Sequence, residues 1–341
     1  MQGSRTPSMP INVRGHQRHP STGSVDSVGS EPDFDIIAFA STSRYNTLYA
    51  MRVPRPVMLF NGYPMKMRGI NKVHIEPNQF QRGKELHIKT GDKTRTCCRC
   101  SKIFKMNADG SMPVEECTYH YRGLTNGRTI CCGERKYDSI GCMKSNTHVF
   151  DQMEEEELEK FISTPQVFGP DKRSKNVLAI DCEMAYTTKG LELVKVSLVN
   201  MDGDVELNLI VKPEGTLVCA NTKFSGVTAA EIMSSRDTLK TVHQKMFKLI
   251  NQQTILIGHS LENDLKVLRL EHPLVIDTSI LFAEYGMKPS LRSLTARYLN
   301  KLIQTDAGAN ACHDSVEDAL SCVELVHYLV RQTFPYRHRR Y

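Results

Sequence analysis

The sequence predicts an α/β protein in which helices cover the faces of a mixed sheet. Three observations in the second half of the 341-residue chain support this fold class. The aliphatic run at 177–180 is too apolar for a loop and too short for a helix, which indicates a buried strand. The apolar runs 191–199 and 205–211 flank an Asp-Gly turn and are typical of a hairpin. Beyond 237, helical and strand patterns alternate.

The elements after the hairpin follow from periodicity and from one capping residue. Apolar residues recur every three to four positions where a helix is expected and run without interruption where a strand is expected. Ser260 is placed to cap the second of three helices. The predicted order is helix 237–252, strand 254–259, helix 261–270, strand 274–277 and helix 314–331.

The first half of the chain divides by composition. Residues 1–33 contain no Phe, Tyr or Trp and are dense in Ser, Gly and Pro, so they predict a disordered tail. Apolar pieces in 34–65 are separated by prolines and are expected to pack on the segment that follows. We assign 34–150 as a basic Cys/His-rich region, 151–170 as a linker helix, because of its glutamates and loosely helical spacing, and 171–341 as the α/β domain.

Composition limits the classes of protein. A hydrophobic content of 40% supports a core. No stretch is as apolar and long as a membrane span, and the N-terminus does not have the layout of a secretory signal, so a soluble protein made in the cytosol is expected. The eleven cysteines are then expected to be reduced thiols or metal ligands. The net charge of +6 favours a polyanionic partner.

The positive charge is concentrated in a segment that also contains candidate zinc ligands. Residues 66–144 hold 16 Lys and Arg against 8 Asp and Glu, a net charge of +8. Two short spacings, Cys97-x2-Cys100 and Cys117-x2-His120, supply the four ligands of a closed tetrahedral zinc site. Cys98 is an alternative to Cys97, and buried free thiols are the alternative to a metal.

A second zinc site is an alternative use of the remaining ligands. It would combine Cys132, Cys142, His148 and a leftover cysteine. Metal binding would let this core-poor segment fold. Tyr119, Tyr121 and Tyr137 lie among the basic residues and would either stack on bases or pack around the metal.

Acidic residues follow the first predicted strand. Asp181 and Glu183 lie on the same face, because side chains alternate along a strand, and Cys182 between them is expected in the core. Two adjacent anions require a cation, and hard oxygen ligands suit Mg²⁺ or Mn²⁺. The alternative is a strand that ends in a polar turn. Asp264 in the first turn of its helix would point over the strand ends or simply occupy a favourable position for an anion.

The last helix adds an acid and a histidine. Asp318 lies on a helix whose other residues are apolar on the side facing the sheet, where an acid is unfavourable unless a cation neutralises it. His313 lies at the mouth of this helix, five residues earlier. An imidazole with its ordinary pKa is suited to accept a proton near neutral pH.

In this order, Asp181-x-Glu183, the stretch 258–264 that ends in Asp264, and His313-x4-Asp318 resemble the DEDDh branch of the RNase T and DnaQ-type 3′ to 5′ exonucleases. The residues around these acids and at 191–193 and 224–228 are similar to the RNA exonuclease 1 and GOR type. The resemblance covers about 177–331 and implies an RNase H-like fold, with 171–341 as the exonuclease domain.

The resemblance also implies the chemistry. A metal-dependent exoribonuclease would hydrolyse single-stranded RNA from its 3′ end and release nucleoside 5′-monophosphates with two Mg²⁺ or Mn²⁺ ions. Asp181 would bridge both ions, Glu183 and Asp318 would complete the first, and Asp264 would support the site through water. His313 would be the general base, and the Cys-rich region would aid RNA binding.

Other roles depend more on context. By resemblance, Met184 would touch the terminal base, and the loop of Ser225, Gly226 and Val227 would lie beside the last nucleotide; core packing and a plain glycine turn are the alternatives. His259 is expected to be structural. The basic run 337–340 would reach phosphates, act as an import signal or form a solvated tail, and with the resemblance it suggests the nucleus or nucleolus. A non-catalytic zinc and RNA-binding scaffold and a single-stranded DNA exonuclease remain alternative functions.

Overall fold

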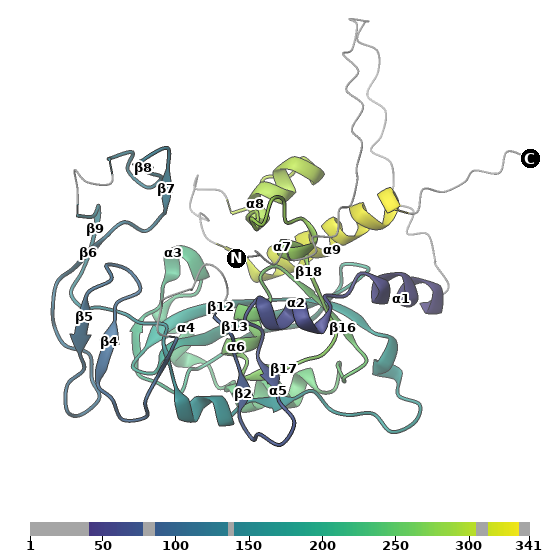
Figure 1. Ribbon diagram of the computed structural model, residues 1–341, viewed down its shortest axis with the longest axis horizontal. Coiled ribbons are helices and arrows are strands. Elements are labelled where there is room, and N and C mark those ends of the chain that lie inside the picture. Colours follow the sequence, from purple (N-terminus) through teal and green to yellow (C-terminus); the bar gives the residue numbers. More distant parts are fainter. Residues whose placement is uncertain (1–40, 78–85, 136–139, 305–312, 334–341) are drawn as a thin grey trace, which may run out of the picture. The chain divides into compact units, whose positions relative to one another are not determined.

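The computed structural model describes residues 41–77, 86–135, 140–304 and 313–333 (Figure 1). The predicted tail 1–33 and the basic run 337–340 lie outside these ranges. In the described ranges, no helix has the length and apolar character needed to cross a membrane.

A mixed sheet is the centre of the fold, as the sequence predicted. Its strands run in the order β14-β13-β12-β16-β18, with β15 also paired to β12. β13 and β14 are antiparallel to their neighbours, whereas β16 and β18 run parallel to β12. The bounds are β12 Val177–Thr187, β13 Gly190–Asn200, β14 Val205–Ile210, β15 Leu217–Cys219, β16 Ile255–Gly258 and β18 Val275–Asp277.

Helices cover both faces of this sheet (Figure 1). On one face, α5 and α6 pack on Ile180 and Cys182, which confirms that Cys182 is a core residue. On the other face, α8 and α9 pack on Ala179 and Ile257. Asp181 and Glu183 alternate with Ile180 and Cys182, so they belong to the face that α9 covers. The helices are α3 Thr222–Ser225, α4 Ala229–Ser234, α5 Leu239–Met246, α6 Glu262–Val267, α7 Thr278–Leu281, α8 Leu291–Leu294 with the π-helical turn Thr295–Leu299, and α9 Ser315–Thr333.

β12 is longer than predicted, so the two acids lie inside a strand and not at its end. β13 pairs with β12 along nearly the whole length of β12, but β16 pairs only with the first three residues of β12. A bulge falls between Glu183 and Met184. The parallel strand β16 ends at Gly258, beside the point where the acids begin, and ligands commonly bind at the carboxyl ends of parallel strands.

The first two helices pack on this sheet and not on the segment that follows them. α1 (Ser41–Ala50) and α2 (Arg55–Phe60) are separated by Pro54, as the prolines predicted. Leu48 lies in the same core cluster as α9, and the backbone N–H of Val53 donates to the carbonyl of Val275 at 2.8 Å. The sheet offers these residues a large apolar surface, which the Cys-rich segment does not have.

The Cys-rich segment consists of short strand pairs around a small core. Its main buried cluster contains Phe104, Met106, Phe150 and two cysteines. The pairs are β4 with β5, β6 with β9 and β7 with β8. Their bounds are β4 Thr94–Thr96, β5 Ile103–Lys105, β6 Cys117–Tyr119, β7 Leu124–Thr125, β8 Arg128–Thr129 and β9 Met143–Ser145, and a further pair joins β1 Met65–Lys66 to β2 Val73–His74.

The linker helix predicted for 151–170 is wrong. The segment forms β10 (Met153–Glu154), a 3-10 turn (Glu155–Glu159) and β11 (Ile162–Ser163). β10 pairs with β3 (His87–Ile88) and β11 pairs with β17 (Leu270–Glu271). Tertiary contacts determine this conformation, because Leu158 and Phe161 are buried with Val73 and Ile75. Ser260 is also not a cap: it has a φ of 55°, Leu261 is the N-cap residue and the helix begins at Glu262.

Candidate active site and metal centres

Three of the predicted catalytic residues meet at one point. Glu183 from β12, Asp318 from α9 and His313 each place a ligand atom within 4.8 Å of the others. His313 Nδ1 lies 3.6 Å from Asp318 Oδ2. The backbone N–H of His313 donates to the carbonyl of Phe224 at 3.0 Å, which fixes the residue before the helix.

Asp264 adjoins this group from the other side of the strand backbone. Its Oδ1 accepts the backbone N–H of Cys182 at 2.8 Å, between the two acids of β12. The turn from β16 to α6 makes this approach feasible because Gly258 has no Cβ; a Cβ there would lie 2.6 Å from Leu261 Cδ1. Asp264 therefore lies next to Asp181 and Glu183 in space although the sequence separates them widely.

Burial raises the pKa of all four carboxylates, and other acids of the site raise it further at Asp181 and Glu183. Burial, and then the charge of Asp318, raises the pKa of Glu183 to about 9. Burial is also the main cause that raises the pKa of Asp318 to about 7. The pKa values of Asp181 and Asp264 lie well above the ordinary range, mainly through burial, and Asp264, Asp318 and Glu183 add to the effect at Asp181. The charged form of this group is unfavourable near neutral pH without a cation.

The donor set fits a hard divalent ion. Glu183 Oε1 and Asp318 Oδ1 are buried and have no hydrogen-bond partner among the described residues. The other oxygen of Asp318 accepts from Gln304 Nε2 at 2.8 Å. Clustered carboxylate oxygens are the ligands that Mg²⁺ and Mn²⁺ prefer.

Two side chains of the predicted substrate loop are directed into the protein. Ser225 is buried and its Oγ donates to the carbonyl of Ala220 at 2.9 Å. Val227 is buried in a core cluster with Ala185. These two side chains therefore stabilise the loop and the core, and Gly226, with a φ of 65°, ends helix α3. Met184 is partly buried and packs against the core cluster beneath α5.

Sequence reasoning missed several neighbours of the acids. Lys195 lies opposite Glu183 in the antiparallel register and lowers the pKa of Glu183. The register of the two strands alone could therefore have identified Lys195 as a neighbour of the acids. Lys195 Nζ also lies 3.5 Å from Asp314 Oδ1. Gln304 carried no such signal, because no local pattern links it to Asp318, 14 positions later in the sequence.

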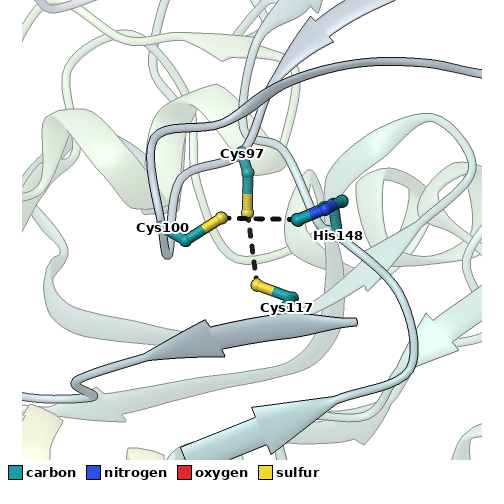
Figure 2. A group of neighbouring side chains, drawn as sticks. All are labelled: Cys97, Cys100, Cys117 and His148. Atoms are coloured by element: carbon teal, nitrogen blue, oxygen red, sulfur yellow. Dashed lines mark hydrogen bonds between the residues drawn. The ribbon is translucent and has the colours of Figure 1, made fainter. Parts of the chain in front are cut away.

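The first Cys/His group contains Cys97, Cys100, Cys117 and His148 (Figure 2). The predicted fourth ligand, His120, is wrong: β6 extends from Cys117 to Tyr119 and carries His120, the next residue, away from Cys117 and into another Cys/His group. Cys98 is exposed and lies outside the group. His148 is 1% exposed, and its Nε2 lies 3.4 Å from Glu115 Oε2, as an outer carboxylate does behind a metal-bound histidine.

The spacing of these four ligands matches a zinc tetrahedron. Cys97 Sγ lies 3.7 Å from Cys117 Sγ, and Cys100 Sγ lies 3.4 Å from His148 Nδ1. Zinc bonds of about 2.0–2.3 Å give tetrahedral edges of about 3.4–3.8 Å. Burial alone would raise the pKa of the Cys97 thiol, but hydrogen bonds from backbone N–H groups, that of Cys100 foremost, lower it to about 6.

A second group contains His120, Cys131, Cys132 and Cys142. Cys132 and Cys142, which the sequence suggested for a second site, belong to this group, but His148, also suggested for it, belongs to the first group, so the two histidines were exchanged. Cys131 Sγ lies 3.4 Å from His120 Nδ1 and 3.5 Å from Cys142 Sγ. Burial alone would raise the pKa of the Cys131 thiol, but the Arg122 backbone N–H and neighbouring side chains donate to it and lower the pKa to about 6.

Two of the three singled-out tyrosines lie in the described residues, and both have neighbours. The Arg99 guanidinium carbon lies 4.8 Å from the ring centroid of Tyr119. The ring of Tyr121 lies 3.5 Å from Lys223 Nζ and 6.2 Å, centroid to centroid, from Phe224. Tyr137 lies outside the described residues.

Comparison with known proteins places the acids in a family. Residues 178–326 match the RNase_T exonuclease family model. The chain is 44% identical over 283 residues to the putative RNA exonuclease pqe-1 of Caenorhabditis elegans, covering 80% of this chain and 17% of that protein. It is 39% identical over 250 residues to the human RNA exonuclease 1 homolog, covering 70% of this chain and 20% of that protein.

The chain thus spans about a fifth of the length of each of these two relatives. Among solved structures, the Neurospora crassa Pan2 catalytic unit aligns with a TM-score of 0.43 and 26% identity, over 50% of this chain and 30% of that chain, a likeness too distant to bear on the site. Glu183, Asp264 and Asp318 all fall within the matched segment. Residues 178–326 are an exonuclease domain of the RNase T family, similar to the RNA exonuclease 1 homologs.

Proposed function

We propose that this chain is a metal-dependent exoribonuclease that removes nucleotides from the single-stranded 3′ end of RNA and releases nucleoside 5′-monophosphates. The observation that carries the proposal is the meeting of Glu183, Asp318 and His313 inside the exonuclease domain, with two buried carboxylate oxygens that have no partner among the described residues. The names of both relatives support RNA as the substrate.

Two divalent ions, Mg²⁺ or Mn²⁺, would be held by Asp181, Glu183, Asp264 and Asp318. When bound, the ions would supply charge stabilisation on the attacking and leaving oxygens of the phosphodiester. The protein contributes the shape of the site: β12 fixes two of the acids, and α6 and α9 each add one. Lys195 supplies a nearby positive charge on the strand that pairs with β12.

His313 acts as the base that takes a proton from the attacking water. Its Nδ1 lies toward Asp318, so Nε2 is the nitrogen left to accept this proton. Burial, and then Arg122, lowers the pKa of His313, which keeps the imidazole neutral and able to accept a proton at neutral pH.

In this proposal, the 3′ end of the substrate lies beside the α3 loop, which is helix α3 with Gly226 and Val227 after it. Lys223 is exposed and Phe224 is half-buried next to His313, with ring centroids 6.2 Å apart. A lysine and an aromatic ring provide contacts for a phosphate and a base. Met184 and the backbone at Gly226 complete the proposed contacts with the terminal nucleotide.

The Cys-rich segment would aid RNA binding and be held by zinc. We assign its first zinc ion to Cys97, Cys100, Cys117 and His148, in place of the set predicted from sequence. The donor types, the edges of 3.4 and 3.7 Å and the carboxylate behind His148 support zinc. The net charge of +8 in residues 66–144 supports a polyanionic partner.

Asp181→Asn tests the proposal. The variant should lose at least about a hundredfold of the Mn²⁺- or Mg²⁺-dependent shortening of a labelled single-stranded RNA, because an amide cannot replace a carboxylate ligand. Asp204→Asn, an equivalent change at an exposed acid of the β13–β14 turn, should retain full activity. Equal rates for Asp181→Asn and the wild-type protein would refute the function.

A further inference from the structure

The second Cys/His group adjoins the active site through the residue that follows its histidine. Tyr121 comes directly after His120, and its ring lies against Lys223 and Phe224 of the α3 loop. We propose that His120, Cys131, Cys132 and Cys142 bind a second zinc ion, which holds Tyr121 against this loop and thereby positions the catalytic base His313. The zinc site itself does not depend on the proposed function, whereas its effect on catalysis rests on that function.

The ligand geometry supports zinc in this group. One histidine nitrogen and three sulfurs form a donor set common in structural zinc sites. Distances of 3.4 and 3.6 Å from His120 Nδ1 to Cys131 and Cys132, and of 3.5 Å between Cys131 and Cys142, match the edges of a zinc tetrahedron of about 3.4–3.8 Å.

The backbone around the group is shaped to bring these ligands together. The N–H of Cys142 donates to the carbonyl of Tyr119 at 3.1 Å, which places Cys142 beside His120. This approach requires a glycine at 141, where a Cβ would lie 2.3 Å from the backbone nitrogen of Tyr119. The N–H of Arg122 donates to the sulfur of Cys131, as backbone amides do around metal-bound thiolates.

Core packing does not explain this group. Cys132 and Cys142 are exposed and Cys131 is only half-buried, unlike ordinary core thiols. The apolar residues nearby are also exposed: Leu124 by 45%, Ile130 by 52% and Ile140 by 85%. A segment with so little buried apolar surface gains its stability from metal binding.

Direct contacts lead from this group to the base. The ring of Tyr121 lies 3.5 Å from Lys223 Nζ and 6.2 Å from the Phe224 ring. The carbonyl of Phe224 accepts the backbone N–H of His313 at 3.0 Å, and the Phe224 ring meets the imidazole edge-on at 6.2 Å. Tyr121 is thus a positioning residue, two contacts away from the reacting atoms.

Zinc content tests the site. The full chain, purified with zinc, should hold two zinc ions per molecule by elemental analysis, and Cys142→Ser should hold one. Cys98→Ser removes an exposed cysteine outside both groups and should still hold two. One zinc ion in the wild-type protein, or no loss in Cys142→Ser, would overturn the proposal.

Kinetics test the coupling. Tyr121→Ala keeps all four ligands and should hold two zinc ions, yet its kcat should fall about tenfold to a hundredfold, because a misplaced base is a poor base. The loss should appear both on RNA and on the p-nitrophenyl ester of a nucleoside 5′-monophosphate, which has no upstream nucleotides to bind. Cys142→Ser should show the same loss of kcat. Tyr121→Phe, which keeps the ring, should retain the wild-type kcat.

The outcomes separate the two claims. If Cys142→Ser loses one zinc ion without a change in kcat, or if Tyr121→Ala raises only the KM for RNA, the positioning role is overturned. An inactive wild-type protein would refute the proposed function and the coupling together. The zinc count would still decide the metal site.

Discussion

The carboxylate group and the two Cys/His groups gather metal ligands in opposite ways. The four acids are fixed by β12, α6 and α9, elements that belong to large apolar cores on both faces of the sheet. The Cys/His groups lie in a segment whose main core cluster has only five fully buried residues. The fold therefore holds the acids together against their mutual repulsion, whereas the cysteines hold their own segment together.

The difference predicts what each metal does. A divalent ion at the acids should relieve electrostatic strain and enable chemistry, with little effect on whether the domain folds. Zinc at the cysteines should supply folding energy to its segment. Removing zinc or its ligands should therefore disrupt the structure of the Cys-rich segment, whereas removing the divalent ions or the acids should disrupt catalysis.

Zinc removal should have the largest structural effect. A chelator selective for zinc over magnesium should make residues 86–135 and 140–150 sensitive to limited proteolysis, because apparent zinc binding energies of about 10–16 kcal/mol per site would be lost. The sheet from β12 to β18 should stay protected. The cleavage sites can be mapped by mass spectrometry, and added Zn²⁺, but not Mg²⁺, should restore protection; unchanged cleavage would exclude a structural metal.

Glu183→Gln should stabilise the metal-free protein while removing its activity. Because the pKa of Glu183 rises from 4.5 to about 9 on folding, mainly through burial, the folded state without divalent ions loses stability as the pH rises from 4.5 to about 9. Glutamine does not ionise, so the stability of the variant lacks this dependence on pH. In chelator at pH 8 the variant should melt roughly 5 °C above the wild-type protein, and the two should converge near pH 4.5.

A matched change at an exposed glutamate controls for this result. Glu324 lies on the exposed side of α9 in an ion pair with Lys301, so Glu324→Gln should leave both the melting temperature and its pH dependence nearly unchanged. A wild-type protein that is more stable than Glu183→Gln in chelator at pH 8 would contradict the repulsion among the acids.

A buried acid of the same sheet sharpens the contrast, because it needs no cation. Asp277 accepts hydrogen bonds from Tyr63 Oη at 2.6 Å, from the Ser260 and Leu261 backbone and from both donors of Ser279. Tyr63→Phe should lower the free energy of unfolding by about 1.5–3 kcal/mol, the usual value for a hydrogen bond to a charged group.

Urea unfolding measures this smaller effect. Tyr45→Phe, which removes an exposed hydrogen bond to the Gln253 carbonyl, should change the free energy of unfolding by less than about 0.5 kcal/mol. Equal effects of the two substitutions would show that the buried hydrogen bond to Asp277 adds no more to stability than the exposed one does.

The sequence predicted the sheet and the shared face of its two acids, but it did not predict which cysteines each histidine joins. Alternation along β12 placed Asp181 and Glu183 opposite Cys182, and the Asp-Gly turn predicted the β13–β14 hairpin. These signals are local. His148 and His120 were exchanged because each partner set depends on how β6 pairs with β9, a contact between residues 24 to 28 positions apart.

The same reason explains the other errors. The linker helix failed because Leu158 and Phe161 are buried against Val73 and Ile75, distant residues that override a loose helical pattern. The contact of Tyr121 with the α3 loop joins residues about a hundred positions apart and left no periodicity to detect. Local patterns predicted elements, whereas the site also depended on long-range contacts.

The measurement that tests the central claim most directly is a digestion series on matched 5′-labelled RNA and DNA oligomers with free or blocked 3′ ends, in Mn²⁺ or Mg²⁺. The account predicts stepwise shortening of RNA with a free 3′ end, release of nucleoside 5′-monophosphates and no reaction on blocked ends. Faster shortening of DNA would contradict the assigned substrate. Cleavage of blocked oligomers, or activity that survives removal of divalent ions, would contradict the 3′ to 5′ mechanism itself.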